Sequence, residues 1–337
     1  MKKERIFITG SLGFIGFHAS IRLKQMQATV LGVDNCNNYY DRKWKFIRLQ
    51  ELKKNLIPVC PLDITDSKAL EKVFLDFKPT KILHLAAQAG VRYSQENPKA
   101  YLKSNIEGTF NLFELAKRTS TPIVFASSSS VYGQNKKIPF SETDPTDHPM
   151  SLYAMTKKSN ELMAETYHFL HQINTIGLRF FTVFGPYGRP DMAYFSFAEK
   201  ILKEESITVF DKGELQRDFT YIDDIVDGIV SALKFPVANG IFNLGHHQPH
   251  SVNELIFYLE KHLNKKAIIS YLPAPKVDVK TTFACLEKSS KILNFQPQIS
   301  FEEGIKRFCQ WYLLHRETLF DLEKEQKKHP EYFLSDL

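Results

Sequence analysis

The sequence has few cysteines for its length, with four among 337 residues. Cys36, Cys60, Cys285 and Cys309 lack the spacing of a metal site and are too few to crosslink a chain of this size. The composition therefore argues against a disulfide scaffold and predicts reduced thiols in a cytoplasmic protein. The segment GHHQPH lacks further ligands at metal spacing, so we interpret it as a solvated loop and expect no metal.

Long hydrophobic runs are also missing, since no apolar stretch approaches the ~20 residues that a membrane helix needs. The first residues, MKKERIFITGSLGFIG, place lysines before an apolar run, as a signal peptide does. Glu4, Arg5 and the glycines within this run argue against that interpretation. We therefore expect a soluble protein without a membrane partner.

Clusters of one charge are absent as well. The net charge of +6 is spread along the chain without a long basic block. Proteins that bind nucleic acids usually show a clustered basic face or a known module. We therefore predict no nucleic-acid partner, and a mildly basic surface that suits an anionic small molecule.

The sequence does contain a regular alternation of short apolar runs and helical patterns, and 43% of its residues are hydrophobic. Seven runs are rich in strand-forming residues: RIFITG, TVLGVD, LIPVC, KILHLAA, PIVFASSS, NTIGLRFF and GIFNLG. Helical patterns cover residues 14–26, 67–77, 98–119 and 151–173. This alternation predicts an α/β fold built on a doubly wound parallel sheet.

The alternation breaks up after about residue 180, where proline and glycine punctuate the chain. We predict a first domain over residues 1–180, to which a segment around 215–250 returns. A smaller, interleaved mixed α/β domain is predicted over 181–320, followed by a charged C-terminal tail over 321–337.

Three glycines lie between the first predicted strand and the first predicted helix, in FITGSLGFIG. Gly10, Gly13 and Gly16 follow the spacing G-x-x-G-x-x-G. A turn without side chains lets a dinucleotide pyrophosphate approach the backbone and the N-terminus of the next helix. Tight turns also use glycine, but at this strand–helix junction we interpret the three as the dinucleotide loop of a Rossmann domain.

Asp34 ends the second predicted strand, in GVDNCNNYY. An acidic side chain there accepts hydrogen bonds from the adenosine ribose and repels a 2′-phosphate, which favours NAD over NADP. The alternative is an aspartate that only forms a turn. Asp63 and Ile64 follow the third strand, and the small residues of HLAAQAG follow the fourth, where adenine and the nicotinamide ribose are expected.

The pattern Tyr-x-x-x-Lys occurs three times, and on a helix it aligns both side chains on one face. A lysine that favours ionisation of the tyrosine makes the phenol a general base. Tyr39 lies in a predicted loop and Tyr132 in a turn-rich stretch, whereas YAMTKKSNELMAETYHFL has a sustained helical period. We therefore predict Tyr153 and Lys157 as the working pair.

Four serines at residues 127–130 end the fifth predicted strand, in ASSSSVYG. Neither G-x-S-x-G nor a convincing His–Asp pairing accompanies them, which argues against a hydrolase nucleophile. A hydroxyl that hydrogen-bonds a substrate hydroxyl and relays a proton fits better. A serine-rich junction that satisfies its own backbone remains the alternative for at least one of the four.

These motifs together resemble the extended short-chain dehydrogenases/reductases, and within them NAD-dependent nucleotide-sugar epimerases of the bacterial UDP-glucuronate 4-epimerase type. The resemblance extends to about Tyr312 and is carried by GSLGFIG, HLAAQAGVRYSQENPKAYLKSNIEGT, ASSSSVYG, YAMTKKSNE, LRFFTVFGPYGRPDMA and RDFTYIDDIVDG. It implies tightly held NAD and epimerisation of UDP-glucuronate to UDP-galacturonate through a 4-keto sugar. It also implies a homodimer formed through the helices at 98–119 and 151–173.

The resemblance further implies a role for individual residues. Tyr153 would take the proton from the C4 hydroxyl, with its pKa lowered by Lys157 and the positive nicotinamide, while Ser128 hydrogen-bonds the same hydroxyl. Cofactor contacts are implied for Gly10, Gly13, Phe14, Ile15, Gly16, Asp34, Asn35, Asp63, Ile64, Leu85, Ala86, Ala87, Asn105, Tyr153, Lys157 and Phe181. Substrate contacts are implied for Arg92, Ser128, Ser129, Ser130, Thr182, Arg189, Arg217, Lys276 and Asp278.

Two features favour a uronate substrate. Related dehydratases and decarboxylases carry acidic residues on the serine loop, whereas Ser129 and Ser130 are neutral hydroxyls that could hold a carboxylate. The guanidinium of Arg189, in GPYGRPDMA, suits bidentate capture of a carboxylate; the alternative is a surface loop arginine. Arg92 and Arg217 are candidates for the sugar or diphosphate and could equally be structural ion-pair partners.

One stretch departs from the family pattern. APKVDVKTTFACLEKSS has Lys276 and Val277 before Asp278, and Cys285 at the usual aspartate, so Lys276 could take over a diphosphate contact. The alternatives to a uronate epimerase are a C4 epimerase of UDP-glucose or UDP-N-acetylglucosamine, a UDP-glucuronate decarboxylase, and a non-catalytic NAD-binding protein.

Overall fold

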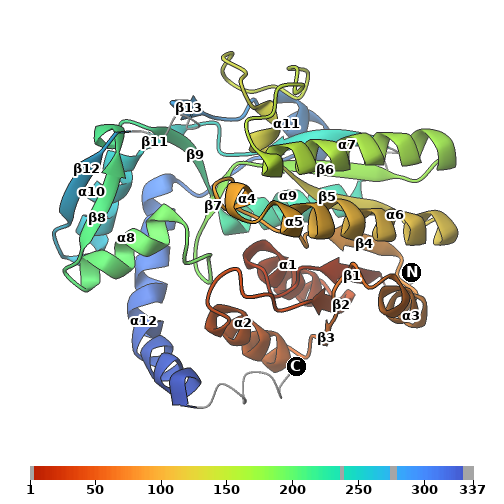
Figure 1. Cartoon of the computed structure of the whole chain (residues 1–337), viewed down its shortest axis with the longest axis horizontal. Coiled ribbons are helices and arrows are strands. Elements are labelled where there is room, and N and C mark those ends of the chain that lie inside the picture. Colours follow the sequence, from red (N-terminus) through yellow and green to blue (C-terminus); the bar gives the residue numbers. More distant parts are fainter. Residues whose placement is uncertain (1–3, 236–238, 274–278, 329–337) are drawn as a thin grey trace.

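The computed structural model describes residues 4–235, 239–273 and 279–328. Its centre is a seven-stranded parallel sheet with the strand order β10-β6-β5-β4-β1-β2-β3 (Figure 1). The strands are β1 (Arg5–Thr9), β2 (Thr29–Asp34), β3 (Val59–Pro61), β4 (Lys81–His84), β5 (Ile123–Ser128), β6 (Thr175–Phe180) and β10 (Asn239–Leu244). The seven predicted strands and the doubly wound parallel sheet are confirmed.

Helices cover both faces of this sheet (Figure 1). One face carries α1 (Phe14–Gln25), α2 (Lys43–Lys54) and α9 (Ile222–Lys234), and the other carries α3 (Ser67–Phe77), α6 (Gly108–Thr119) and α7 (Leu152–His171). The short helices α4 (Tyr93–Glu96) and α5 (Pro98–Tyr101) and the π-helix η1 (Leu102–Glu107) precede α6, and the 3-10 helix η2 (Ser129–Tyr132) follows β5. The four predicted helical stretches are confirmed, the third being divided among α5, η1 and α6.

The strands are apolar throughout because both faces of the sheet are covered. Ile6, Phe7 and Ile8 of β1 are fully buried, and they alternate between two clusters. Phe7 packs edge-on against Phe74 of α3, with ring centroids 5.3 Å apart, while its two neighbours face the other cluster. Burial of each such side chain stabilises the fold by roughly 1.5–3 kcal/mol.

A smaller lobe follows in sequence, and most of it lies beside the sheet, on the left in Figure 1. Its helix Glu287–Leu293 packs instead against β10 and α9. It contains β7 (Thr182–Phe184), β8 (Ser206–Phe210), β9 (Gln216–Tyr221), β11 (Pro249–Ser251), β12 (Ile268–Leu272), β13 (Thr281–Thr282), the 3-10 helix η3 (Asp211–Gly213), α8 (Ala193–Leu202), α10 (Val252–Leu263), α11 (Glu287–Leu293) and α12 (Phe301–Lys328). α9 and β10 lie between β9 and β11 in sequence yet belong to the main sheet layer. No helix in the described ranges has both the length and the apolar character needed to cross a membrane.

The strand order reverses between β1 and β4. Successive strands run from β1 toward β3 on one side and from β4 toward β10 on the other. Open α/β sheets bind ligands at such a switch point, outside the carboxyl ends of the strands. The glycine loop leaves β1 at this point, and Asp34 and Ser128 end β2 and β5.

Candidate active site

The glycine loop between β1 and α1 lines a pocket at the switch point. Gly10 has a φ of +72°, and a Cβ there would lie 2.7 Å from the Ala86 nitrogen. A Cβ on Gly16 would collide with the Gly10 carbonyl. All of α1 is described, and its first turn carries no acidic residue. The loop and the N-terminus of α1 therefore suit an anion such as a pyrophosphate.

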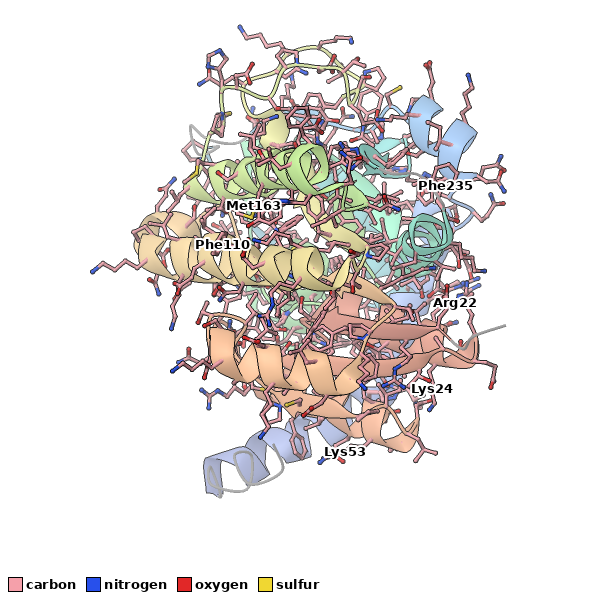
Figure 2. The ribbon with its side chains drawn as sticks, turned by 90° about the vertical axis from the view of Figure 1, so that its right-hand side faces the viewer. Arg22, Lys24, Lys53, Phe110, Met163 and Phe235 are labelled. Carbon is pink, nitrogen blue, oxygen red and sulfur yellow. The ribbon has the colours of Figure 1, made fainter. Side chains whose placement is uncertain are left out.

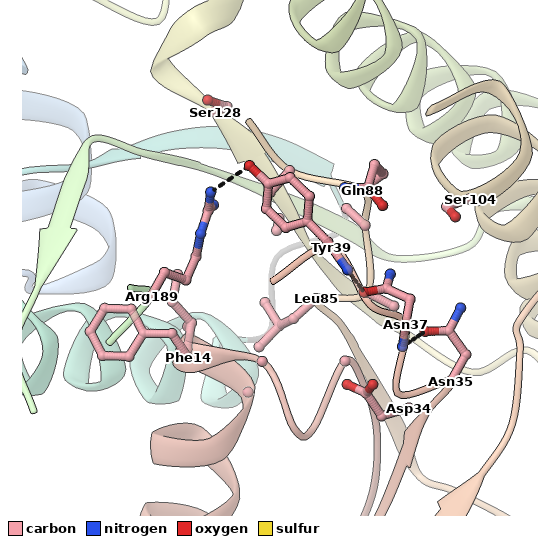
Figure 3. A pocket seen from close by; sticks show the side chains of 18 of the residues that line it. Phe14, Asp34, Asn35, Asn37, Tyr39, Leu85, Gln88, Ser104, Ser128 and Arg189 are labelled. Carbon is pink, nitrogen blue, oxygen red and sulfur yellow. Dashed lines mark hydrogen bonds between the residues drawn. The ribbon is translucent and has the colours of Figure 1, made fainter. Parts of the chain in front are cut away.

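Asp34 is buried at the end of β2, at the same end of the pocket (Figure 3). Its carboxylate accepts hydrogen bonds from the Leu12 amide at 3.1 Å and from the Lys45 ammonium at 3.2 Å. The Asn35 amide donates to Asp63 at 3.0 Å, and both of these residues line the pocket. Lys45, which the sequence analysis misses, adds a cationic donor beside the acid predicted to bind the ribose.

Tyr153 lies in the first turn of α7, where Ser151 caps the helix by accepting a hydrogen bond from the Ala154 amide at 3.1 Å. Burial raises the pKa of Tyr153, while the Ser128 hydroxyl and the charge of Arg189 lower it. The groups that favour the phenolate in this structure are thus on the serine loop and on the Arg189 loop.

Lys157 follows one turn later and lines the same pocket. Its ammonium donates to the Ala126 carbonyl at 2.8 Å. Burial lowers the pKa of Lys157 to about 8, and the nearby Glu161 carboxylate opposes that shift. In the described structure Lys157 is therefore held against the backbone of β5.

The serines of ASSSSVYG have separate surroundings. Ser128 lines the pocket, and its Oγ accepts hydrogen bonds from the Ser130 amide at 3.2 Å and the Ser130 hydroxyl at 2.8 Å. These bonds occupy the acceptor sites of Ser128 and leave its proton to be donated elsewhere. Among the described residues, neither Ser129 nor Ser130 lines the pocket, and the position of Ser130 makes it a support for Ser128.

Ser127 also lines the pocket, and its side chain belongs to a buried network. Its hydroxyl donates to Glu161 at 2.6 Å, and Arg179 donates to both oxygens of that carboxylate at 2.8 and 2.9 Å. All three side chains are buried, and the Arg179 guanidinium lies 4.7 Å from the centre of the Tyr132 ring. The end of β5 is thereby tied to α7 and β6 by an ion pair that solvent does not screen.

Arg189 reaches the pocket from the loop between β7 and α8 (Figure 3). Its Nε donates to Asp191 at 3.0 Å, and its Nη2 donates to the same carboxylate and, at 3.3 Å, to the Tyr39 hydroxyl. Tyr39 in turn donates to Asp191 at 3.0 Å. Although burial opposes it, the Asp191 carboxylate raises the pKa of Arg189, so the guanidinium stays charged. Tyr39 thus belongs to the hydrogen-bond network around this arginine.

Asn105, predicted as a cofactor contact, is fully buried in η1 and is not among the described residues that line the pocket. The Asn105 side-chain oxygen accepts from the backbone N–H of Gln88 at 2.7 Å. Its Nδ2 donates to the backbone carbonyl of Gln88 at 3.1 Å and to the Thr156 hydroxyl at 3.0 Å. Gln88 does line the pocket, and its buried Nε2 has no hydrogen-bond partner in the described structure. Asn105 thus positions a residue that has a donor to offer a ligand.

Several predicted substrate contacts lie outside the pocket lining. Thr182 begins β7 next to Phe181, which does line it. Arg92 stacks on the Phe210 ring at 5.0 Å, and Arg217 donates to the Val279 carbonyl at 2.8 Å. Lys276 and Asp278 lie outside the described residues.

The remaining predicted contacts come together in one pocket. Its lining includes Gly10, Gly13, Phe14, Ile15, Gly16, Asp34, Asn35, Asp63, Ile64, Leu85, Ala86, Ala87, Ser128, Tyr153, Lys157, Phe181 and Arg189. It also includes residues that sequence reasoning misses, among them Asn37, Tyr39, Tyr40, Lys45, Gln88, Ser104 and Met192. These lie on loops, on α2 and on η1, where no local pattern distinguishes a pocket residue from its neighbours.

Comparison with known proteins agrees with this geometry. The model of the NAD dependent epimerase/dehydratase family matches residues 6–245. The uncharacterized protein MJ1055 of Methanocaldococcus jannaschii is 51% identical, over 96% of this chain and 100% of that protein. UDP-glucuronate 4-epimerase 5 of Arabidopsis thaliana is 46% identical, over 91% of this chain and 75% of that protein.

A solved structure shares the whole architecture. The crystal structure of UDP-glucuronic acid 4-epimerase from Bacillus cereus, in complex with UDP-glucuronic acid and NAD, is 32% identical and superposes with a TM-score of 0.86. The superposition covers 92% of this chain and 99% of that one. The motifs, the pocket at the switch point and these matches together show that the chain belongs to the NAD dependent epimerase/dehydratase family.

Proposed function

We propose that this chain is an NAD-dependent 4-epimerase that interconverts UDP-glucuronate and UDP-galacturonate. The observation that carries the proposal is the convergence of Tyr153, Ser128 and Arg189 in the pocket that begins at the glycine loop. The named activity of the plant relative and the ligands of the Bacillus cereus enzyme support it.

The residues present fit NAD, which supplies a reversible hydride acceptor when bound. The close backbone approach at Gly10 and the N-terminus of α1 suit the pyrophosphate. Asp34 and Lys45 together offer an acceptor and a donor to the adenosine ribose. The unpaired Nε2 of Gln88 offers a further donor at the pocket wall.

Tyr153 and Ser128 would share the C4 oxygen of the sugar. Ser128 donates a hydrogen bond to that oxygen, and the Tyr153 phenolate accepts the hydroxyl proton as the C4 hydrogen leaves. Because burial raises the Tyr153 pKa, the phenolate needs positive charge nearby, which Arg189 provides. The 4-keto sugar then turns in the pocket, and Tyr153 returns its proton to the alcohol of the other configuration.

Arg189 would hold the sugar carboxylate. Asp191 occupies its Nε–Nη2 edge, and in the described structure the Nη1 donors make no hydrogen bond, so we assign Nη1 to the uronate. The carboxylates among the described lining residues are Asp34, which lies at the end of the pocket opposite Ser128 (Figure 3), and Asp63, which is bonded to Asn35 next to Asp34 in the chain. Asp191 lies beside Arg189 but accepts hydrogen bonds from Arg189 and Tyr39. Because no carboxylate among the described lining residues lies at Ser128, epimerisation is favoured over decarboxylation.

Incubation with UDP-glucuronate, followed by NMR of the anomeric protons, tests the proposal. We expect the anomeric signal of UDP-galacturonate to appear until both sugars are at equilibrium. An unchanged spectrum together with turnover of UDP-glucose or UDP-N-acetylglucosamine would contradict the uronate assignment. Release of CO₂ would identify a decarboxylase instead, and failure to turn over any UDP-sugar would leave an NAD-binding protein without catalysis.

We further propose that the chain forms a homodimer in the cytoplasm. Phe110 of α6 and Met163 of α7 lie on the same side of the molecule (Figure 2). Phe110 is exposed, and so are Leu162, Phe169 and Leu170 of α7. An apolar surface of this kind suits burial against a second copy. All four cysteines are free, as expected for a reducing compartment. Sedimentation of wild-type protein against Leu162→Glu tests the dimer, which the substitution should dissociate.

A further inference from the structure

Arg48 of α2 is a fully buried cation, and no carboxylate in the described structure forms an ion pair with it. Its guanidinium is satisfied by neutral oxygens: the Leu12 carbonyl at 2.9 Å, the Tyr187 carbonyl at 2.9 Å, the Gly188 carbonyl at 2.8 Å and the Tyr40 hydroxyl at 2.7 Å. Burial of a charge is unfavourable unless its N–H groups are all bonded. The carbonyls around Arg48 are therefore held in place by its donors.

These carbonyls come from two segments far apart in sequence. Leu12 lies in the glycine loop, whereas Tyr187 and Gly188 directly precede Arg189. Arg48 bonds all three with the same planar group, whose donors have a fixed geometry. A shift of one segment therefore changes the hydrogen bonds available to the other.

On the glycine loop, Arg48 forms one of the two hydrogen bonds that hold Leu12 in place. The Leu12 carbonyl accepts from Arg48, while the Leu12 amide donates to Asp34 at 3.1 Å. Asp34 also accepts from the Cys36 amide at 2.9 Å and from Lys45. The orientation of this peptide thus depends on both Arg48 and the acid at the adenosine end of the pocket.

On the other loop, Arg48 stabilises an unfavourable backbone. Tyr187 has a φ of +56°, a conformation that costs a non-glycine residue of order 1 kcal/mol. A Cβ on Gly188 would collide with the Tyr194 hydroxyl. The two carbonyls that accept from Arg48 belong to these strained and crowded residues, and the next residue is Arg189.

We propose that Arg48 is a positioning residue that couples the retention of NAD to the binding of the sugar. Arg48 fixes the Leu12 peptide and the Tyr187–Gly188 backbone relative to one another. A ligand bound at one of the two loops therefore also orders the other loop. The NAD part rests on family membership, and the sugar part rests on the proposed function. A coupling of this kind is reciprocal, so UDP-glucuronate should slow the release of NAD.

Exchange of bound NAD against isotopically labelled NAD, followed by mass spectrometry, measures the release rate with and without UDP-glucuronate. For wild-type protein we expect the sugar to slow release by about tenfold, within the range usual for coupled sites. In Arg48→Lys and Arg48→Met, release should be faster and the effect of the sugar should be lost. Arg48→Lys keeps the charge but lacks the planar fork, and it decides the question if Arg48→Met fails to fold.

Arg5→Met is the matched control. Arg5 also donates to a backbone carbonyl, that of Phe77 at 2.8 Å, but it begins β1, at the end of that strand opposite the glycine loop. It should leave NAD exchange unchanged, even if it lowers the thermal midpoint. Wild-type protein without coupling, or an Arg48→Lys protein that keeps it, would overturn the proposal. Absent binding of UDP-glucuronate in calorimetry would instead refute the proposed function, and the sugar-free release rates would still decide whether Arg48 retains NAD.

Discussion

Two buried arginines support the active site in different ways, one in its catalytic half, which holds Tyr153 and Ser128, and one in its binding half, which comprises the glycine loop and the Arg189 loop. Arg179, behind the serine loop, forms a bidentate ion pair with Glu161. Arg48, behind the glycine loop, bonds backbone carbonyls of two loops. Loss of Glu161 leaves a buried charge without its partner, whereas displacement of a carbonyl from Arg48 removes one hydrogen bond among several.

This difference matches what each half has to do. General acid–base chemistry requires Tyr153 and Ser128 to stay within hydrogen-bond reach of one oxygen. Sugar and cofactor loops, by contrast, must accept ligands. The Arg179–Glu161 ion pair therefore fixes the end of β5 in the catalytic half, whereas Arg48 holds the two binding loops through hydrogen bonds to their backbones that can be exchanged.

The largest expected effect is confined to the catalytic half. Tyr153→Phe removes the proton acceptor while it preserves the ring against Tyr101. We expect the turnover number to fall by about 10²- to 10⁴-fold, the usual contribution of general acid–base catalysis. Steady-state assays with UDP-glucuronate measure this, and NAD content per protomer is the control, which should not change. Activity near the wild-type level would remove Tyr153 from the mechanism.

The second prediction concerns the stability of the catalytic half. Glu161→Leu leaves Arg179 buried without its carboxylate and Ser127 without its acceptor. The free energy of unfolding should fall by about 3–5 kcal/mol, as for other broken buried pairs. Urea titration at pH 7 measures the change.

A double substitution separates the charge from the packing. Glu161→Leu with Arg179→Met removes both charges, and we expect it to recover most of the lost stability. A double variant as unstable as the single one would mean that shape, not charge, holds this network together.

The third prediction tests the binding half. Asp191→Asn weakens the hold on the Nε–Nη2 edge of Arg189. Charge-assisted hydrogen bonds contribute about 1.5–3 kcal/mol, so the KM for UDP-glucuronate should rise about tenfold or more with a smaller change in kcat. Binding of UDP, measured by calorimetry, should not change because UDP has no uronate. A lower KM in the variant would show that Asp191 competes with the substrate rather than orienting Arg189.

The smallest expected effect is a change in pH dependence. His18 contacts the Pro186 carbonyl at 2.8 Å, and burial lowers its pKa from 6.5 to about 4, with Arg48 adding to the shift. Between these values the unfolded chain binds a proton that the native state does not, so stability rises with pH from about 4 to 6.5. His18 is only partly buried, so its share is about 1 kcal/mol.

His18→Gln removes the titrating group and can retain the contact with Pro186. We expect a flatter stability profile between pH 4 and 6.5 than for wild-type protein. Substitution of the exposed His171 by glutamine is the control. A His18→Gln profile that matches wild type would mean that other groups account for the acid sensitivity of this region.

The two halves also differ in how far the sequence predicts them. The strands and α7 are predictable because covered parallel strands are continuous apolar runs and α7 has a sustained helical period. α2 is not, because its buried side chains include Lys43, Lys45 and Arg48. A helix that turns basic residues inward lacks the apolar periodicity by which helices are recognised.

The site follows the same division. The glycine loop and Tyr153 with Lys157 lie in local motifs, which a sequence displays directly. The contact between Tyr39 and Asp191 joins residues 152 positions apart and depends on how a loop folds over the sheet. Asn105 lies in a motif that predicts a cofactor contact, but its side chain hydrogen-bonds Gln88 and Thr156.

The hydrogen bonds from Ser130 to Ser128 fix the direction in which the Ser128 hydroxyl donates. Because Ser130 donates twice, the Ser128 oxygen is saturated and its hydrogen must point away from Ser130. A carboxylate at position 130 could only accept, so it would draw that hydrogen toward itself and turn the Ser128 lone pairs outward. One side-chain exchange next to the reacting hydroxyl would thus reverse the direction of a hydrogen bond, and with it the form in which Ser128 meets a sugar.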